Sequence, residues 1–199
     1  ATANDHPQLD IAALVLLNSA GGMTGFRYET VPVWAHPIMG HFQYYLLGNQ
    51  HGQFLYQTLV NKGLIELILN NLYVDKTNVN DDLLDILLQP AADTGAQQVF
   101  LNVFRGPAGP TREELLEKIL QSSSSTPPRI LTLWGQDDSF TPLDEDVKAL
   151  PALYNKGGAE QEDPLMTLDI IENASHCLHD EHPEVVNAKM LKFLDGLDL

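Results

Sequence analysis

An acidic side chain and a histidine that could share a proton follow two short apolar runs of this chain. Asp137 and Asp138 come after the run from Arg129 to Trp134, and His176 comes after the run from Met166 to Ile171. Histidine is the usual general base near neutral pH, and a carboxylate can hold one of its tautomers and stabilise the imidazolium that forms. The pattern therefore predicts a general base, His176, that is oriented by an acid.

The apolar runs predict the elements that would position these residues. Each run has the length and the β-branched or aromatic content of a strand buried in a parallel sheet. A third run, from Ile11 to Asn18, has the same character. Open α/β sheets place their chemistry at the carboxyl ends of the strands. We therefore expect an α/β fold in which the acid and the histidine lie at one edge of a mostly parallel sheet.

The order of the two residues favours one group of folds. In α/β-hydrolases the chain order is nucleophile, acid and histidine, and the nucleophile lies in a Gly-x-Ser-x-Gly elbow between a strand and a helix. Asp138 precedes His176, but the sequence contains no Gly-x-Ser-x-Gly. Residues 1–9 read as a helix end and a turn that lead into the first strand. We therefore expect the chain to be the C-terminal portion of a hydrolase, cut just after its nucleophile.

The segment that begins at the histidine resembles a known group of enzymes. His176 to Asn187 is similar to the C-terminal signature of plastid and cyanobacterial α/β-hydrolases, especially of pheophytinase and its chlorophyll dephytylase and chlorophyllase-like relatives. Three other stretches also resemble this group: Leu16 to Ala20, Tyr73 to Val79, and Gly135 to Asp138 with Pro142. Only the histidine segment is specific, because Gly-x-x-Asp is shared with esterases, dehalogenases and epoxide hydrolases.

The resemblance implies an activity and roles for two residues. The activity is that of a carboxylic-ester hydrolase that removes phytol from chlorophyll or pheophytin, with its serine and oxyanion hole upstream of this chain. His176 matches the family's base, and Asp138, three residues after Gly135, matches its acid. Asp137 is the rival acid, and the structural alternative for Asp138 is a turn cap. The resemblance also implies a chloroplast location, a hydrophobic ester substrate, and no cofactor, because any magnesium belongs to the substrate.

The segment between the first two strands predicts a helical cap. Apolar residues fall at helical spacing in four stretches, and this is far more helix than one crossover requires. These stretches are residues 54–60, 64–69, 83–88 and 99–104. Thr111 followed by Glu114 is a capping box that begins the returning helix. We therefore expect an α/β-hydrolase core in residues 1–25 and 110–199, and a cap in residues 26–109.

Composition and strand number bear on the partners. The formal net charge is −16, with 11 Lys and Arg residues, which argues against nucleic-acid binding. No run of about 18 apolar residues is present, so we expect no transmembrane segment. Three strands alone would leave a long unpaired sheet edge. We therefore expect that a separate N-terminal fragment, which carries the nucleophile, stays associated with this chain.

Several alternatives remain open from the sequence. The enzyme alternative is an epoxide hydrolase or dehalogenase with an aspartate nucleophile, and the non-enzyme alternative is a hydrolase-fold pigment-binding module. Cys177, the single cysteine, is expected to be a buried packing residue rather than a nucleophile. Asn18 is expected either to contact the substrate or to form a turn. His179, Asp180 and Glu181 are expected either to shape the pocket or its supporting hydrogen bonds, or to be a helix cap at Asp180 with solvated neighbours.

Overall fold

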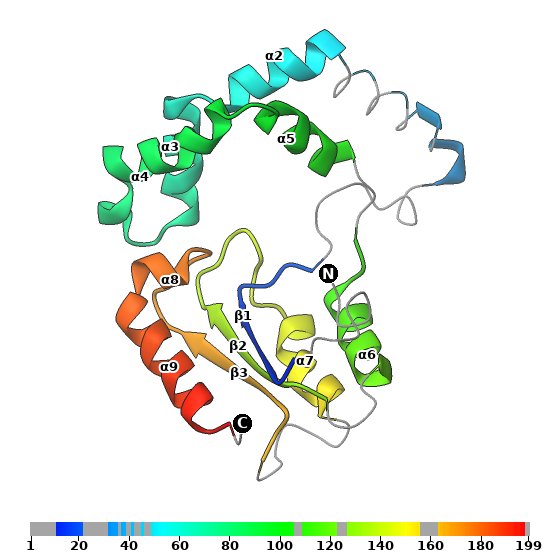
Figure 1. Ribbon diagram of the computed structural model, residues 1–199, viewed down its shortest axis with the longest axis vertical. Helices are drawn as coiled ribbons and strands as arrows, with labels where there is room; N and C mark the ends of the chain where they lie inside the picture. Colours follow the sequence, from blue (N-terminus) through cyan, green and yellow to red (C-terminus); the bar gives the residue numbers. More distant parts are fainter. Residues whose placement is uncertain are drawn as a thin grey trace. The chain divides into compact units, whose positions relative to one another are not determined.

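The three predicted strands form one parallel sheet (Figure 1). A computed structural model of the protein describes residues 11–21, 32–35, 37–38, 41, 45, 49–105, 109–122, 127–155 and 163–197. The strands are β1 (Ala13–Leu17), β2 (Arg129–Gly135) and β3 (Met166–Ile171), in the order β1-β2-β3. Because all pairs are parallel, the carboxyl ends of the strands meet at one edge. Residues 1–9, which we predict to be a helix end and a turn, lie outside the described residues.

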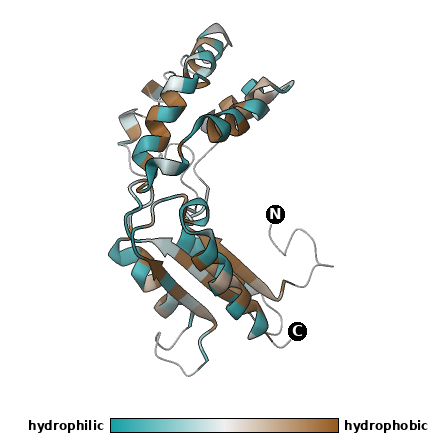
Figure 2. Cartoon of the chain, turned by 90° about the vertical axis from the view of Figure 1, so that its left-hand side faces the viewer, coloured by the Kyte–Doolittle hydropathy of each residue, from teal (hydrophilic) through white to brown (hydrophobic). Residues whose placement is uncertain are grey.

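Helices cover both faces of this sheet (Figures 1 and 2). Ile130 and Trp134 of β2 pack against α6 (Arg112–Ser122) and α7 (Glu145–Tyr154). Leu131 and Leu133 point the other way and pack against α8 (Leu178–Glu181) and α9 (Pro183–Asp195). Each such side chain contributes about 1.5–3 kcal/mol by burial. The central strand is apolar along nearly its whole length because both of its faces are buried.

Local signals place the starts of the helices around the sheet. The capping box that begins α6 is present, since Thr111 N donates to Glu114 Oε2 at 2.9 Å and Glu114 N donates to Thr111 Oγ1 at 3.1 Å. Asp144 caps α7 by accepting a hydrogen bond from Val147 N at 2.9 Å. α9 begins at Pro183, where the missing N–H of proline costs no helical hydrogen bond.

The chain divides into two compact units. One comprises Ala1–Ala20, Leu72–Asp75 and Thr111–Leu199, and the other comprises Gly21–Asn71 and Lys76–Pro110. Helices occupy the four segments that apolar spacing predicts, and three short 3-10 helices accompany them in the described residues. The α-helices are α2 (Asn49–Leu59), α3 (Lys62–Leu72), α4 (Asp81–Leu88) and α5 (Ala96–Arg105), and the 3-10 helices are η3 (Val33–Ala35), η4 (Lys76–Asn78) and η5 (Gln89–Ala92). No helix of the described residues is both long and apolar enough to cross a membrane.

Aromatic packing joins two helices of the second unit. The rings of Tyr56 in α2 and Phe100 in α5 meet edge to face, with centroids 5.4 Å apart. The Tyr56 hydroxyl donates to the carbonyl of Ala91 in η5 at 2.8 Å. These contacts give this unit a small core of its own.

Asn18 ties the carboxyl ends of the strands together. Its backbone N–H continues the ladder by donating to Leu133 O at 3.0 Å, and its side-chain Oδ1 accepts from Gly135 N at 2.8 Å. Its Nδ2 donates to the carbonyls of Ser175 and His176, both at 2.8 Å. The backbone of Asn18 is left-handed, with φ 41°, a region that asparagine tolerates better than most residues. The buried Asn18 is therefore a structural link between three segments.

Gly135 lets the loop after β3, which carries His176 and is called the histidine loop below, approach the end of β2. A Cβ at this position would lie 2.3 Å from the Ser175 carbonyl oxygen and 2.5 Å from that of Ala174. Both obstacles are backbone atoms, so they cannot turn aside as a side chain could. The glycine of the Gly-x-x-Asp pattern is thus required by the close packing of the loop before His176.

We predict that the Asn18 side chain stabilises the fold. Asn18→Gly in the complete protein should lower the free energy of unfolding by about 2–4 kcal/mol, since glycine keeps the left-handed backbone but leaves one buried N–H and two buried carbonyls without their partner. Urea unfolding measures this change.

Asn173 supplies the matched control. It also has a left-handed backbone, with φ 53°, but its side chain is exposed. Asn173→Gly should change the free energy of unfolding by less than about 0.5 kcal/mol. Equal effects of the two substitutions would mean that the backbone conformation, and not the side-chain hydrogen bonds, accounts for Asn18.

Candidate active site

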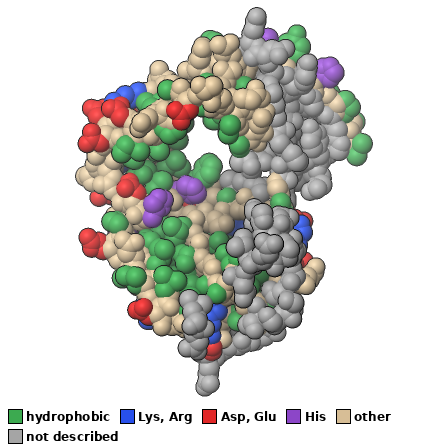
Figure 3. All heavy atoms as spheres, in the orientation of Figure 1, with side chains coloured by type: hydrophobic (Ala, Val, Ile, Leu, Met, Phe, Trp, Pro, Cys, Tyr) green, Lys and Arg blue, Asp and Glu red, His purple; other side chains and the backbone are tan. Residues whose placement is uncertain are grey.

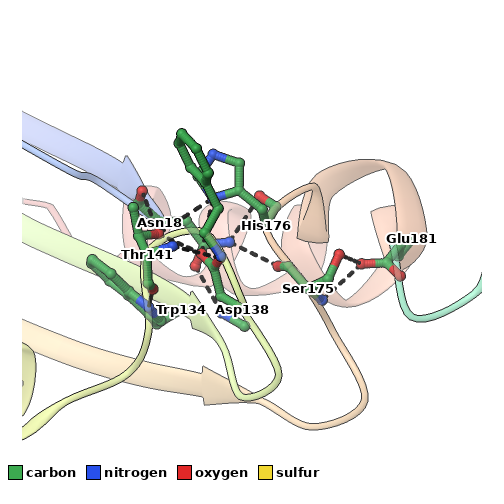
Figure 4. Close-up of polar contacts among 9 residues, drawn as sticks. Asn18, Trp134, Asp138, Thr141, Ser175, His176 and Glu181 are labelled. Carbon is green, nitrogen blue, oxygen red and sulfur yellow. Dashed lines mark hydrogen bonds and ion pairs between the residues drawn. The ribbon is translucent and has the colours of Figure 1, made fainter. Parts of the chain in front are cut away.

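Asp138 and His176 meet at the carboxyl edge of the sheet (Figure 4). Asp138 lies in the loop after β2 and His176 in the loop after β3, and His176 Nδ1 is 2.9 Å from Asp138 Oδ2. A carboxylate only accepts hydrogen bonds, so Nδ1 is the nitrogen that carries the proton. This arrangement leaves Nε2 of His176 as the nitrogen that could take up or release a proton.

The Asp138 carboxylate is fully buried and well supplied with donors. Its Oδ1 accepts from the backbone N–H groups of Phe140 and Thr141, both at 2.8 Å. Its Oδ2 accepts from the Thr141 hydroxyl at 2.5 Å in addition to facing His176. A buried carboxylate needs such partners, because burying an unpaired charge costs several kcal/mol or more. Asp138 therefore caps the turn with one oxygen and orients the histidine with the other.

The rival acid, Asp137, does not take part in this contact. Its side chain is exposed, while its backbone N–H donates to the Ala174 carbonyl at 3.0 Å. Trp134 helps to fix the turn that contains both aspartates, since its buried indole Nε1 donates to the Thr141 carbonyl at 2.9 Å. The turn thus directs Asp138 inward and Asp137 outward.

The His176 ring is partly open to solvent and packs beside an aromatic ring. Its side chain is 27% exposed, and its ring centroid lies 4.9 Å from that of Phe140 in an edge-to-face arrangement. The Thr141 hydroxyl oxygen lies 3.3 Å from His176 Nδ1. Nδ1 is thus held between two oxygens, while part of the ring remains reachable by another molecule.

Thr141 is a site residue that the sequence analysis missed. It is buried, and it joins Asp138 and His176 through one hydroxyl. A signal for it was present, since threonine three residues after an aspartate in a turn can donate to that carboxylate. Asn18, which the sequence pattern assigns either to the substrate or to a turn, lies in a bend after β1 and donates to the carbonyls of Ser175 and His176.

The chemistry of Cys177 favours packing over nucleophilic attack. Burial raises the pKa of the Cys177 thiol above its usual value. A nucleophilic cysteine needs the opposite shift, because the thiolate is the reactive form. The neighbouring Tyr73 is buried as well, and burial raises the pKa of its phenol. Both groups therefore stay protonated near neutral pH.

Acidic side chains dominate the charge of the protein without forming a metal cluster in the described part. The chain has 27 Asp and Glu residues. Those visible in Figure 3 lie mostly along the left rim of the face in view. Within the described residues no group of three or more His, Cys, Asp or Glu side chains could hold a metal ion.

Comparison with known proteins finds similarity to hydrolases. No protein-family model matches the chain. Epoxide hydrolase 2 of Caenorhabditis elegans is 26% identical over 110 residues, which are 55% of this chain and 25% of that protein. The chain thus spans about a quarter of the length of the curated relative that it matches.

Solved structures match over nearly the whole chain. A meta-cleavage product hydrolase from Pseudomonas fluorescens IP01 has a TM-score of 0.59 and 17% identity, and the match covers 98% of this chain and 59% of that one. A thermophilic esterase from Thermogutta terrifontis has a TM-score of 0.50 and 16% identity, with coverages of 94% and 57%. Together with the parallel sheet and the helices on both of its faces, these similarities show that the chain has the α/β-hydrolase fold.

Proposed function

We propose that the complete protein is a carboxylic-ester hydrolase in which His176 is the general base and Asp138 orients it. The observation that carries this proposal is the 2.9 Å contact between His176 Nδ1 and the buried Asp138 Oδ2. In the proposed reaction, a serine upstream of this chain attacks the ester carbonyl, and His176 Nε2 accepts its proton. His176 then returns the proton to the leaving alcohol and activates water for the second step.

The proposed substrate is the phytyl ester of a chlorophyll or a pheophytin. The support is the resemblance of His176 to Asn187 to the corresponding segment of the pheophytinase and chlorophyllase-like group. A chloroplast location is part of the same proposal. The proposed reaction uses no cofactor, since the serine forms the covalent intermediate, water hydrolyses it, and His176, oriented by Asp138, carries the protons.

A second candidate is epoxide hydrolysis. The similarity to Epoxide hydrolase 2 of Caenorhabditis elegans favours it. In that chemistry an aspartate at the upstream elbow would attack an epoxide carbon, and the ring C–O bond would break to an alkoxide that takes a proton from water or a nearby acid. The pair of His176 and Asp138 would then activate water to hydrolyse the ester intermediate and release the diol. The two candidates thus share this pair and differ in the nucleophile.

We predict that His176 and Asp138 are needed for turnover and that Asp137 is not. His176→Ala in the complete protein should lower kcat by about 10^6-fold, and Asp138→Asn by about 10^4-fold, as in serine proteases. In Asp138→Asn the side-chain NH2 can face His176 Nδ1 and stabilise the wrong tautomer. Hydrolysis of a p-nitrophenyl ester, measured per folded enzyme, gives kcat.

Asp137→Asn is the matched control for Asp138→Asn. It removes an exposed carboxylate from the neighbouring position, so kcat should stay near that of the unmodified enzyme. A large loss of kcat in Asp137→Asn together with normal kcat in Asp138→Asn would mean that Asp137, and not Asp138, is the acid.

A substrate comparison separates the ester and the epoxide candidates. We expect the complete protein to release phytol from pheophytin, detected by chromatography, and to leave an aliphatic epoxide unchanged. Sequencing of the upstream elbow should find Gly-x-Ser-x-Gly. Diol formation from the epoxide without phytol release, with aspartate at the elbow, would replace the proposed function by the second candidate.

We also propose that the rest of the sheet comes from a separate N-terminal fragment that binds at β1. In the described residues β1 pairs with β2 on one side and has no strand on the other. Denaturing mass spectrometry of the soluble natural protein should detect a second polypeptide besides this 22.0 kDa chain. A folded, soluble sample that contains the 22.0 kDa species alone would exclude such a fragment, and one longer polypeptide would mean that the chain is not cleaved.

A further inference from the structure

The carboxylate of Glu181 gathers hydrogen bonds from two distant parts of the sequence. Its Oε2 accepts from the backbone N–H of Ser175 at 2.7 Å and from the Ser175 hydroxyl at 2.5 Å, as Figure 4 shows. Its Oε1 accepts from the backbone N–H groups of Val74 at 2.7 Å and Asp75 at 2.9 Å. Each oxygen therefore accepts two hydrogen bonds, which fills the usual capacity of a carboxylate.

One pair of these donors adjoins the proposed general base. Ser175 directly precedes His176, and its side chain and backbone N–H are fixed by Glu181. The carbonyls of Ser175 and His176 are fixed from the other side by Asn18. Glu181 thus accepts from the backbone N–H of Ser175, and Asn18 donates to the carbonyls of Ser175 and His176. The two residues together hold the backbone that carries the His176 ring.

The other pair of donors, Val74 N and Asp75 N, lies in the short segment Leu72–Asp75. This segment belongs to the unit that contains the β-sheet, called the sheet-containing unit below. Leu72–Asp75 belongs to that unit, although the chain on either side of it, Gly21–Asn71 and Lys76–Pro110, belongs to the other. A second contact holds the same segment, because the buried Tyr73 donates its hydroxyl to Asp180 Oδ2 at 2.9 Å. Asp180 and Glu181, adjacent in α8, therefore both bind this segment.

We propose that Glu181 is a positioning residue that sets the place of His176 through Ser175 and couples it to the segment Leu72–Asp75. This inference rests on the proposed function, in which His176 is the general base. Hydrogen bonds to an ionised carboxylate are about twice as strong as those between neutral groups. The negative charge of Glu181 therefore strengthens the hydrogen bonds that position Ser175, and a neutral amide of the same shape does not replace it.

Substitution by glutamine separates charge and hydrogen bonding from shape. In Glu181→Gln one oxygen becomes an NH2 group that donates, so it faces either the donors of Ser175 or those of Val74 and Asp75. Displacement of a catalytic group by about 1 Å can cost about 100-fold in rate. We expect Glu181→Gln in the complete protein to lower kcat on a p-nitrophenyl ester by about 10- to 100-fold with KM little changed.

Glu184→Gln is the matched control. Glu184 lies three residues further on, is exposed, and belongs to the first turn of α9. Its substitution changes the net charge by the same amount and should leave kcat and KM as they are. Equal kcat values for Glu181→Gln and the unmodified enzyme would overturn the positioning role.

Chemical rescue distinguishes positioning from a purely structural role. Glu181→Gly removes the carboxylate and leaves its donors, so added formate should bind there and restore part of kcat. Formate should have no effect on the unmodified enzyme or on Glu184→Gln. A loss of kcat that formate does not restore, accompanied by a lower folded fraction, would make Glu181 a stabilising residue only.

Hydrogen exchange tests the coupling independently of the reaction. Glu181→Gln should speed amide exchange at Ser175 or at Val74 and Asp75, and Glu184→Gln should not. Unchanged exchange at all three amides would contradict the coupling even in an active enzyme. If the unmodified protein hydrolyses no ester while Glu181→Gln still speeds exchange, the proposed function fails and the coupling stands.

Discussion

The burial of one carboxylate organises the carboxyl edge of the sheet. The Asp138 side chain has no exposed surface, so its charge must be balanced by donors that the fold supplies. Two turn amides, the Thr141 hydroxyl and the His176 ring meet that need. Three of these four donors come from the loop after β2 itself, and only His176 comes from another strand. The local turn thus holds Asp138 in place, and the long-range contact then fixes the orientation of the His176 ring.

The long-range contact requires the loops after β2 and β3 to approach very closely. Gly135 allows the carbonyls of Ala174 and Ser175 to pass where any Cβ would collide with them. Asn18 then uses its amide to bind both the end of β2 and the histidine loop. One residue without a side chain and one with a short polar side chain therefore perform complementary tasks. The contact between Asp138 and His176 therefore depends on both Gly135 and Asn18.

The sequence predicted the parts of this site that local patterns encode. Apolar runs located the three strands, and the residues after them included Asp138 and His176, whose side chains could meet because the carboxyl ends of parallel strands share an edge. Helical spacing found the helices of the second unit, and Thr111 with Glu114 marked the start of α6. The sequence left open whether Asn18 contacts the substrate or forms a turn, and whether Glu181 supports the site, because each side chain binds partners about 100 residues or more away in the chain. A local sequence pattern does not predict which distant N–H or carbonyl group a side chain will hydrogen-bond.

The contacts of Glu181 bear on how this fold accepts variation. A helical insertion joined to a sheet only at its two ends could change its sequence with little effect on His176. Here the chain returns to the sheet-containing unit at Leu72–Asp75, between α3 and η4, and two acidic side chains of α8 hold it there. A change in the backbone of this segment therefore reaches Ser175 through a single carboxylate. In the proposed arrangement the segment helps to support His176, so its backbone is constrained by these hydrogen bonds as well as by the helices on either side of it in the chain.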